Sequence, residues 1–223
     1  MSLFRFYLSL LTTATLCWVF VVSAPRLSPF DEKWLPSLGE LHAQISSIDT
    51  RKNTPGYDRD NFGSGWQSPK ANVCNARIAA ISRQSTPYHP HHPRRTPPQQ
   101  CRLPDALFFD PYTQKTSDMS SLKVEVDHVF PLAAAWDLGA HSWDEQQRIR
   151  FANDPINLIA TEKTVNRDKS DSLPSKWMPP SPAAHCWYAK RLLFVAVSYD
   201  LALPAQDLKT ARRACRFTVH VRW

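Results

Sequence analysis

Residues 122–129 (LKVEVDHV) decide the local fold, because their apolar and polar side chains alternate with the two-residue period of a β-strand. Val124 and Val126 fall on one face of the predicted strand, whereas Lys123 and Glu125 fall on the other. No other stretch of the chain shows this period as clearly. The domain is therefore expected to be organised around this strand.

Two polar residues, Asp127 and His128, stand at the end of this strand. On a straight strand their side chains point to opposite faces. If both belong to one site, the strand must end, bend or bulge there, and Pro131 shortly afterwards favours such a break.

The residues that follow predict an inserted helix, a second strand and a further helix, and more helices toward the C-terminus. Capping residues and prolines set the boundaries. The expected elements are a helix from the capping box at 142–145 (SWDE) to about Asn153, a short strand over 157–160, a helix from Glu162 to about Lys169 capped by Thr161, and two packing helices over 183–199 and 206–215.

Two segments precede this unit. The capping box at 37–40 (SLGE) predicts a helix, and Leu38, Leu41, Ile45 and Ile48 recur at helical spacing on its inner face.

Residues 85–100 contain the segment YHPHHPRR and too much proline for a helix or a central strand, so we expect a mobile surface loop. Its three clustered histidines could hold a metal. Because nothing in the sequence fixes their geometry, a tethered insertion is the favoured interpretation.

The composition suits one globular domain, since 43% of the 223 residues are hydrophobic and 21% are charged. The five glycines cannot be assembled into a G-x-G-x-x-G or a G-x-x-x-x-G-K-[ST] motif, which excludes dinucleotide-binding and P-loop chemistry. Nineteen prolines and the lack of an internal repeat exclude coiled coils and solenoids.

Residues 1–24 have the features of a secretory signal peptide, with Arg5, an apolar run over 8–22 and the small-residue pattern VSA at 22–24. The run is short for a bilayer span, although Pro25 after the expected cut leaves an uncleaved anchor as the alternative. We expect a secreted protein, extracellular or periplasmic, consisting of residues 25–223. Removal of Arg5 and no acidic residue lowers the net charge from +7 to +6, a balance that favours polyanions such as nucleic acid.

Four cysteines lie outside the signal segment, and an even count in an oxidising compartment predicts two disulfides. The pairs Cys74–Cys101 and Cys186–Cys215 close the shortest loops and are our choice among three possible connectivities. A four-cysteine zinc site is the alternative. It is disfavoured because no two of these cysteines lie two to four residues apart.

The polar residues that stand out in the strand, insertion and helix unit are Asp127, His128, Asn157 and Asn166. A hard divalent cation prefers oxygen ligands, which the Asp127 carboxylate and the Asn166 amide supply. The His128 imidazole can take a proton from water, and a carbonyl oxygen, here assigned to Asn157, can fix its tautomer. These groups predict a one-metal hydrolase, with Mg²⁺ as the expected ion and Mn²⁺ or another transition metal as alternatives.

Three segments, 126–131 (VDHVFP), 157–158 (NL) and 166–171 (NRDKSD), resemble the ββα-metal finger of HNH endonucleases. More widely, the chain from about Leu38 to Cys215 resembles the secreted HNH nucleases related to the C-terminal domain of GmrSD-type restriction endonucleases. The segments that carry this wider resemblance are 56–63 (GYDRDNFG), 110–113 (DPYT), 135–140 (AWDLGA), 151–154 (FAND) and 177–180 (WMPP).

The resemblance implies a small, mostly helical α+β domain, disulfide-stapled, with an embedded ββα-metal finger over about 122–170 in a single HNH nuclease domain at 25–223. It implies that Asp127 and Asn166 hold the metal, that His128 is the general base and that Asn157 orients it. Asn166 stands where the name-giving motif has His; both residues occur in HNH enzymes.

The expected function is therefore a secreted, metal-dependent endonuclease that hydrolyses phosphodiester bonds of nucleic acid, DNA in the first place, with little sequence specificity. Lys163, Arg167, Lys169 and Lys176 lie on or near the last helix of the unit and could hold flanking phosphates. We expect a monomer with no stable membrane association after signal cleavage. The competing function is a catalytically silent secreted protein that binds nucleic acid or another partner through the same basic surface.

Two further groups have both a functional and a structural interpretation. Tyr57, Phe62 and Trp66 could stack on bases, but core packing is commoner for such aromatics. Asp58 and Asp60 could bind calcium, but an isolated D-x-D more often caps a turn. Neither group is included in the predicted site.

Overall fold

The computed structural model describes residues 34–68, 74–87, 101, 103 and 106–215. Every described residue belongs to one compact unit. The predicted signal peptide at 1–24 and residues 88–100 of the predicted loop lie outside the described residues. Within the described ranges, no helix has the length and apolar character needed to cross a membrane.

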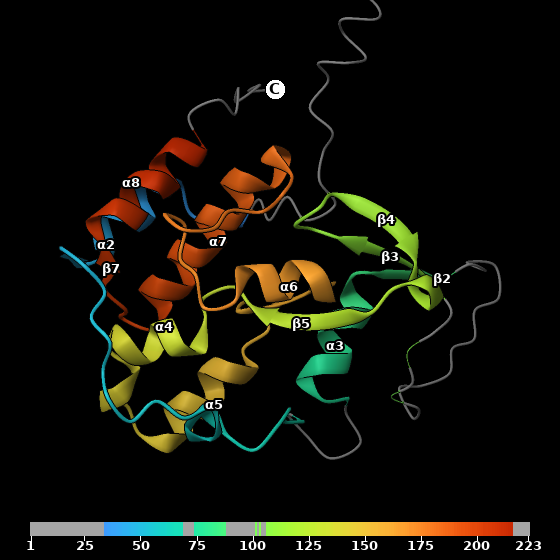
Figure 1. Ribbon diagram of the computed structural model, residues 1–223, viewed down its shortest axis with the longest axis horizontal. Helices are drawn as coiled ribbons and strands as arrows, with labels where there is room; N and C mark the ends of the chain where they lie inside the picture. The colour runs from blue at the N-terminus through green and yellow to red at the C-terminus, as the bar shows by residue number, and fades with distance from the viewer. Residues whose placement is uncertain (1–33, 69–73, 88–100, 102, 104–105, 216–223) are drawn as a thin grey trace, which may run out of the picture. The chain divides into compact units, whose positions relative to one another are not determined.

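Helices make up most of the regular structure, and the strands are short (Figure 1). The α-helices are α2 (Leu38–Gln44), α3 (Ala76–Arg83), α4 (Leu132–Asp137), α5 (Glu145–Asn153), α6 (Lys163–Lys169), α7 (His185–Ser198) and α8 (Ala205–Ala214). The strands are β1 (Ser47–Ile48), β2 (Ser85–Pro87), β3 (Ala106–Asp110), β4 (Lys115–Asp118), β5 (Val124–His128), β6 (Leu158–Glu162) and β7 (Leu203–Pro204). Short 3₁₀ turns are η1 (Arg59–Phe62), η2 (Met119–Ser121), η3 (Ala140–Ser142) and η4 (Pro182–Ala184).

The described strands form three small sheets: a parallel pair β1–β7, an antiparallel sheet in the order β2–β3–β4, and an antiparallel pair β5–β6. The mixture of helices and small sheets agrees with the expected fold class in its coarse form. The register of the β5–β6 pair sets Asp127 opposite Ile159 and His128 opposite Leu158.

The predicted order of strand, insertion, strand and helix is confirmed as β5, the segment with α4 and α5, β6 and α6. Both α6 and α3 pack against the β5–β6 pair (Figure 1). Val126 contributes to a small apolar cluster with Ala80 and Ile81 of α3. Asp127, one residue further along, contacts Lys169 of α6 instead. The alternation of the strand therefore separates an apolar side from a polar one.

The insertion contains one helix more than predicted, α4. The helix follows Pro131 directly and has no side-chain cap, so no capping residue marks its start. The cap of the predicted helix, α5, also differs from the expectation. Asp144 is the N-cap, and its carboxylate accepts from the Gln147 backbone N–H at 2.6 Å, whereas Ser142 belongs to η3. A carboxylate closer to the first turn reaches the free N–H groups that a residue two positions earlier cannot reach.

The expected Thr161 cap is also wrong. Thr161 lies in β6, is fully buried, and donates its hydroxyl to Asp110 at 2.8 Å. Glu162 occupies the N-cap position of α6 without a side-chain bond. The interstrand pairing of β6 continues past the predicted end of that strand and includes the threonine.

Two other boundaries shift because chain pairing takes over from local pattern. The α2 helix has the predicted capping box but ends at Gln44, and Ile48 lies in β1, which pairs with β7. The first residues of the predicted loop, Ser85–Pro87, form the edge strand β2. An edge position tolerates the proline.

The largest apolar cluster gathers side chains from α2, α4, α5, α7 and α8. Phe151 of α5 and Leu192 and Leu193 of α7 are among its fully buried members. The cluster includes residues of the loop after β5 and of the insertion, so both are packed into the core.

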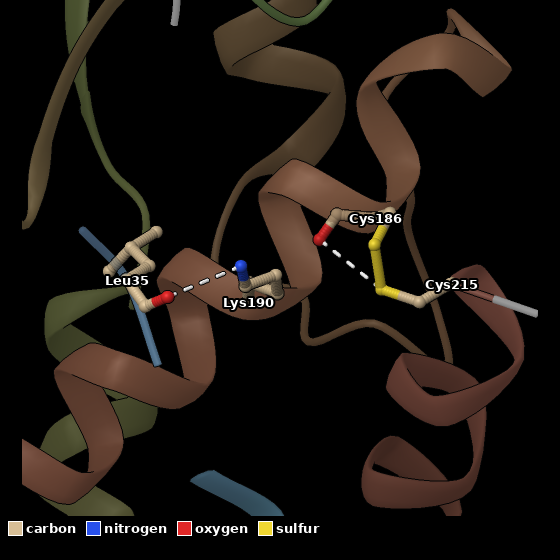
Figure 2. Close-up of a disulfide and its surroundings, with 4 residues drawn as sticks. All are labelled: Leu35, Cys186, Lys190 and Cys215. Carbon is tan, nitrogen blue, oxygen red and sulfur yellow. Dashed lines mark hydrogen bonds between the residues drawn. A yellow bond between two sulfur atoms is a disulfide. The ribbon is translucent and has the colours of Figure 1, made fainter. Parts of the chain in front are cut away.

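The structure joins Cys74 to Cys101 and Cys186 to Cys215, the pairs chosen from the sequence. Figure 2 shows the second bond, which links the first turn of α7 to the end of α8. This pairing leaves these four cysteines no thiolates for the alternative zinc site.

Candidate functional site

A cavity of about 410 Å³ opens at the C-terminal end of β5. Asp127 and His128 line it from the strand, and Asn166 lines it from α6. Tyr57 and Arg59 contribute from the segment that contains η1. The strand ends at His128, as expected for two neighbours that share one site. Three of the four predicted central residues thus lie at one cavity.

Asp127 is almost wholly buried and is held at both carboxylate oxygens. The Lys169 ammonium donates to Oδ1 at 2.9 Å, and the Tyr112 hydroxyl donates to Oδ2 at 2.6 Å. Lys169 also donates to the His128 carbonyl at 2.8 Å. The carboxylate is therefore fixed in position by a buried cation and a buried hydroxyl.

The surroundings of Asp127 act on its pKa in opposite directions. Burial raises the pKa of the carboxyl, while Lys169 and Tyr112 counteract part of this rise because they stabilise the ionised form. Burial likewise lowers the pKa of Lys169, and the negative charge of Asp127 opposes this shift. Each ion compensates for the desolvation of the other.

His128 has a different environment, made of one carbonyl and one aromatic ring. Its Nε2 lies 2.8 Å from the Ala152 carbonyl, at the end of α5. A carbonyl can only accept, so Nε2 carries the proton and Nδ1 keeps its lone pair. The ring stacks on Trp66, with 5.5 Å between centroids and 11° between planes.

The His128 ring is neutral in these surroundings. Burial lowers its pKa to about 3, the Ala152 hydrogen bond opposes this shift, and the positive charges of Arg59 and Lys169 add to it. A neutral imidazole with one free ring nitrogen can accept a proton from water.

Among the described residues, the Asn157 side chain forms no hydrogen bond with the His128 ring, which corrects the expectation. The Asn157 side chain instead accepts from the Phe130 N–H at 2.8 Å and donates to the Phe130 carbonyl at 3.3 Å. Its backbone carbonyl accepts from the Val129 N–H at 2.8 Å. Asn157 therefore shapes the chain that leaves β5. The oxygen that fixes the ring comes from Ala152, because α5 brings its C-terminal carbonyls there.

Asn166 is oriented by Glu125, a residue that the prediction left out. The Asn166 amide Nδ2 donates to Glu125 Oε2 at 2.8 Å, which leaves the amide oxygen without a donor among the described residues. Glu125 also pairs with Lys163 at 3.7 Å. Glu125 precedes Asp127 by two positions on β5, so both carboxylates face α6.

The oxygens of Asp127 and Asn166 are donors that this cavity offers to a divalent cation; the Asp171 carboxylate also lines the cavity but is paired with Arg51 at 2.7 Å. The Asp127 oxygens accept from Lys169 and Tyr112, and the Asn166 amide oxygen has no donor among the described residues. Within the described ranges, no three His, Cys, Asp or Glu side chains gather as a metal cluster. Two such oxygens would leave most of the coordination of a hard cation to water and substrate oxygens.

The four predicted phosphate-binding residues separate into different environments. Lys169 is fully buried in the Asp127 ion pair and cannot reach a flanking phosphate, so this expectation is wrong. Lys163 is part-exposed and paired with Glu125. Arg167 and Lys176 are exposed.

The aromatic residues and the acidic pair that the sequence analysis leaves out of the predicted site have different environments in the structure. Phe62 is buried, as expected for core packing, whereas Trp66 stacks on His128 and the exposed Tyr57 lines the cavity. Asp58 caps η1 by accepting from the Asp60 N–H at 2.9 Å, which agrees with the turn-capping interpretation.

Comparison with known proteins gives the chain a family. The family described as "GmrSD restriction endonucleases, C-terminal domain" matches residues 98–204. An "Uncharacterized secreted protein" of Arthroderma benhamiae is 32% identical over 198 residues, which cover 87% of this chain and 92% of that protein. No solved structure matches the chain. The chain belongs to the family of the C-terminal domain of GmrSD restriction endonucleases, as the resemblance of its motifs predicted.

Proposed function

We propose that the protein is a secreted, divalent-metal-dependent endonuclease that hydrolyses phosphodiester bonds of nucleic acid, DNA in the first place, with little sequence specificity. The observation that carries the proposal is the meeting of Asp127, His128 and Asn166 at one cavity, with His128 neutral and no described residue hydrogen-bonded to its Nδ1. Membership of a restriction-endonuclease family supports the same class of reaction.

In this proposal, β5, β6 and α6 form the ββα-metal finger of an HNH nuclease. Asp127 and Asn166 hold one cation, Mg²⁺ or Mn²⁺, which supplies charge stabilisation for the phosphate and the departing oxygen when bound. Lys169 and Tyr112 position the Asp127 carboxylate, and Glu125 positions the Asn166 amide.

His128 takes the proton from the attacking water at Nδ1, because Nε2 already donates to Ala152. Trp66 and the Ala152 carbonyl hold the ring against rotation. Asn157 acts through the backbone of Val129 and Phe130, and is therefore a positioning residue.

We also propose that the mature protein acts as a secreted monomer without a membrane anchor. Two disulfides and a relative that is named as secreted support the compartment.

The test is incubation of the purified, disulfide-intact protein with supercoiled plasmid and, separately, with single-stranded RNA, in Mg²⁺, Mn²⁺ or EDTA. The matched variant is His128→Ala, which is expected to lower the cleavage rate about 100- to 10,000-fold if His128 is the base. Sequencing the ends of products from random DNA tests the specificity. One dominant end motif would contradict the expected low specificity.

The competing function is a catalytically silent protein that binds nucleic acid. A folded protein that binds plasmid but cleaves neither polymer in any metal would overturn the nuclease proposal in its favour. Cleavage that needs metal and is lost in His128→Ala would exclude the silent protein.

A further inference from the structure

Arg59 lies at the cavity but has no place in the site described so far. It opens η1, its side chain is exposed, and it lines the same cavity as Asp127, His128 and Asn166. It also lines the small neighbouring cavity behind His128, together with Trp66. Its charge is close enough to contribute to the low pKa of His128, after the larger effect of burial.

Three other cations among the described residues in this part of the fold are paired with carboxylates. Lys169 is paired with Asp127, and Lys163 with Glu125. Arg51, which lines a neighbouring cavity together with Tyr57, is paired with both Asp137 and Asp171.

Arg59 differs from them. Among the described residues, no carboxylate lies within ion-pair distance of its guanidinium, and the neighbouring Asp58 carboxylate faces the backbone of its own turn. Apart from His128, Arg59 is the one basic side chain among the described residues that line the cavity.

The backbone beneath Arg59 is held firmly by the insertion. Arg148 of α5 donates from Nε to the Asn61 carbonyl at 2.9 Å, and Asn61 Nδ2 donates to the Gly56 carbonyl at 3.1 Å. Phe62 is buried in the core, and Gly63 ends the turn at φ +95°, where a side chain would be strained. A charged side chain on a fixed base loses little freedom when it binds a ligand.

We propose that Arg59 binds a non-bridging oxygen of the phosphate that the site cleaves. The inference rests on the proposed function, since it names the residue that receives the substrate there. A guanidinium presents paired N–H donors that match phosphate oxygens, and it keeps its charge at any working pH. Its contribution grows as negative charge develops on those oxygens in the transition state.

The test compares Arg59→Ala and Arg59→Lys with the control Arg150→Ala. Arg150 lies on α5, is exposed, and lines neither cavity, so the control removes the same charge away from the site. Arg59→Ala is expected to lower kcat/KM for plasmid cleavage about 100- to 1,000-fold. Arg59→Lys should retain part of the activity, and the control should match the wild type.

A second measurement separates this inference from the proposed function. Binding of inorganic phosphate, followed by ³¹P NMR, is expected in the wild type and Arg150→Ala and should be lost in Arg59→Ala. If the wild type cleaves nothing, the proposed function fails, but loss of phosphate binding in Arg59→Ala alone still supports the assignment. The inference is overturned if Arg59→Ala binds phosphate as well as Arg150→Ala does, or if Arg150→Ala is active and Arg59→Ala cleaves plasmid as fast.

Discussion

Asp127 and His128 are consecutive residues of β5 and are almost equally buried, but the molecule surrounds them with opposite chemistry. Asp127 faces a cation and a hydroxyl, Lys169 and Tyr112, which favour its ionised form. His128 faces a carbonyl and the plane of Trp66, neither of which supplies a negative charge, and its ring stays neutral.

Two neighbouring residues at the end of a strand can take different roles because their surroundings differ. Burial alone disfavours the charged form of both. Only Asp127 receives a compensating ion, so only Asp127 offers a fixed negative charge to a cation. His128, left neutral with a free ring nitrogen, is suited to accept a proton. Removal of a partner on either side should therefore have a different consequence.

The largest effect is expected from Lys169→Met, which removes the cation from the Asp127 side. A buried carboxylate without its ion partner costs about 3–5 kcal/mol of folding free energy. Urea denaturation at neutral pH measures the loss. Lys163→Met is the matched control, because its pair with Glu125 is only part-buried and should cost less than about 1 kcal/mol.

Equal losses in these two lysine variants would contradict the distinction between a buried and a surface pair. If Lys169→Met does not fold, the double variant with Asp127→Leu should recover much of the stability, because it removes the uncompensated charge as well.

An intermediate effect is expected from Glu125→Ala, which frees the Asn166 amide to rotate. Residues that orient a ligand typically change metal affinity about 10- to 100-fold, and we expect a loss of this size for Mn²⁺. Titration of Mn²⁺ followed by EPR gives the affinity. Glu145→Ala, an exposed glutamate in the first turn of α5, serves as the control. Identical affinities in the two variants would remove Glu125 from the site.

The smallest effect is expected on the His128 side, where Trp66→Leu removes the stacked ring and Trp66→Phe keeps an aromatic face. The leucine variant should be less stable than the phenylalanine variant by about 0.5–1.5 kcal/mol, since aromatic pairs add this much beyond burial. Thermal unfolding and plasmid cleavage, measured together, check the prediction. If the two variants agree in both, the stacking has no role in holding His128.

Sequence pattern located the β5–β6–α6 unit and three residues of its cavity because period-two alternation, caps and motif spacing are local signals. Local pattern alone places the helix caps wrongly at Thr161 and Ser142, since strand pairing and a competing Asp144 cap decide those boundaries. Ile48 lies outside the helix because it belongs to β1, which pairs with β7.

The supporting residues of the site come from distant parts of the chain, which a local pattern cannot bring together. Tyr112 and Arg59 stand in segments that carried the family resemblance, but their chemistry depends on contacts across the fold. Lys169 resembled a surface lysine because it follows Arg167 and Asp168 on a polar helix; only its depth reveals the ion pair. The Ala152 carbonyl is a backbone group, so no residue type in the sequence marks it as the partner of His128.

In the proposed function, Asp127 binds the cation and His128 accepts the proton from water. The most direct measurement compares Mn²⁺ affinity by EPR and single-turnover cleavage rate in Asp127→Asn, Asn166→Ala and His128→Ala, with folding checked by circular dichroism. The first two variants are expected to lose both Mn²⁺ affinity and cleavage. His128→Ala is expected to bind Mn²⁺ like the wild type and to cleave about 100- to 10,000-fold more slowly. Loss of Mn²⁺ binding in His128→Ala, or cleavage at the wild-type rate, would contradict the division of roles.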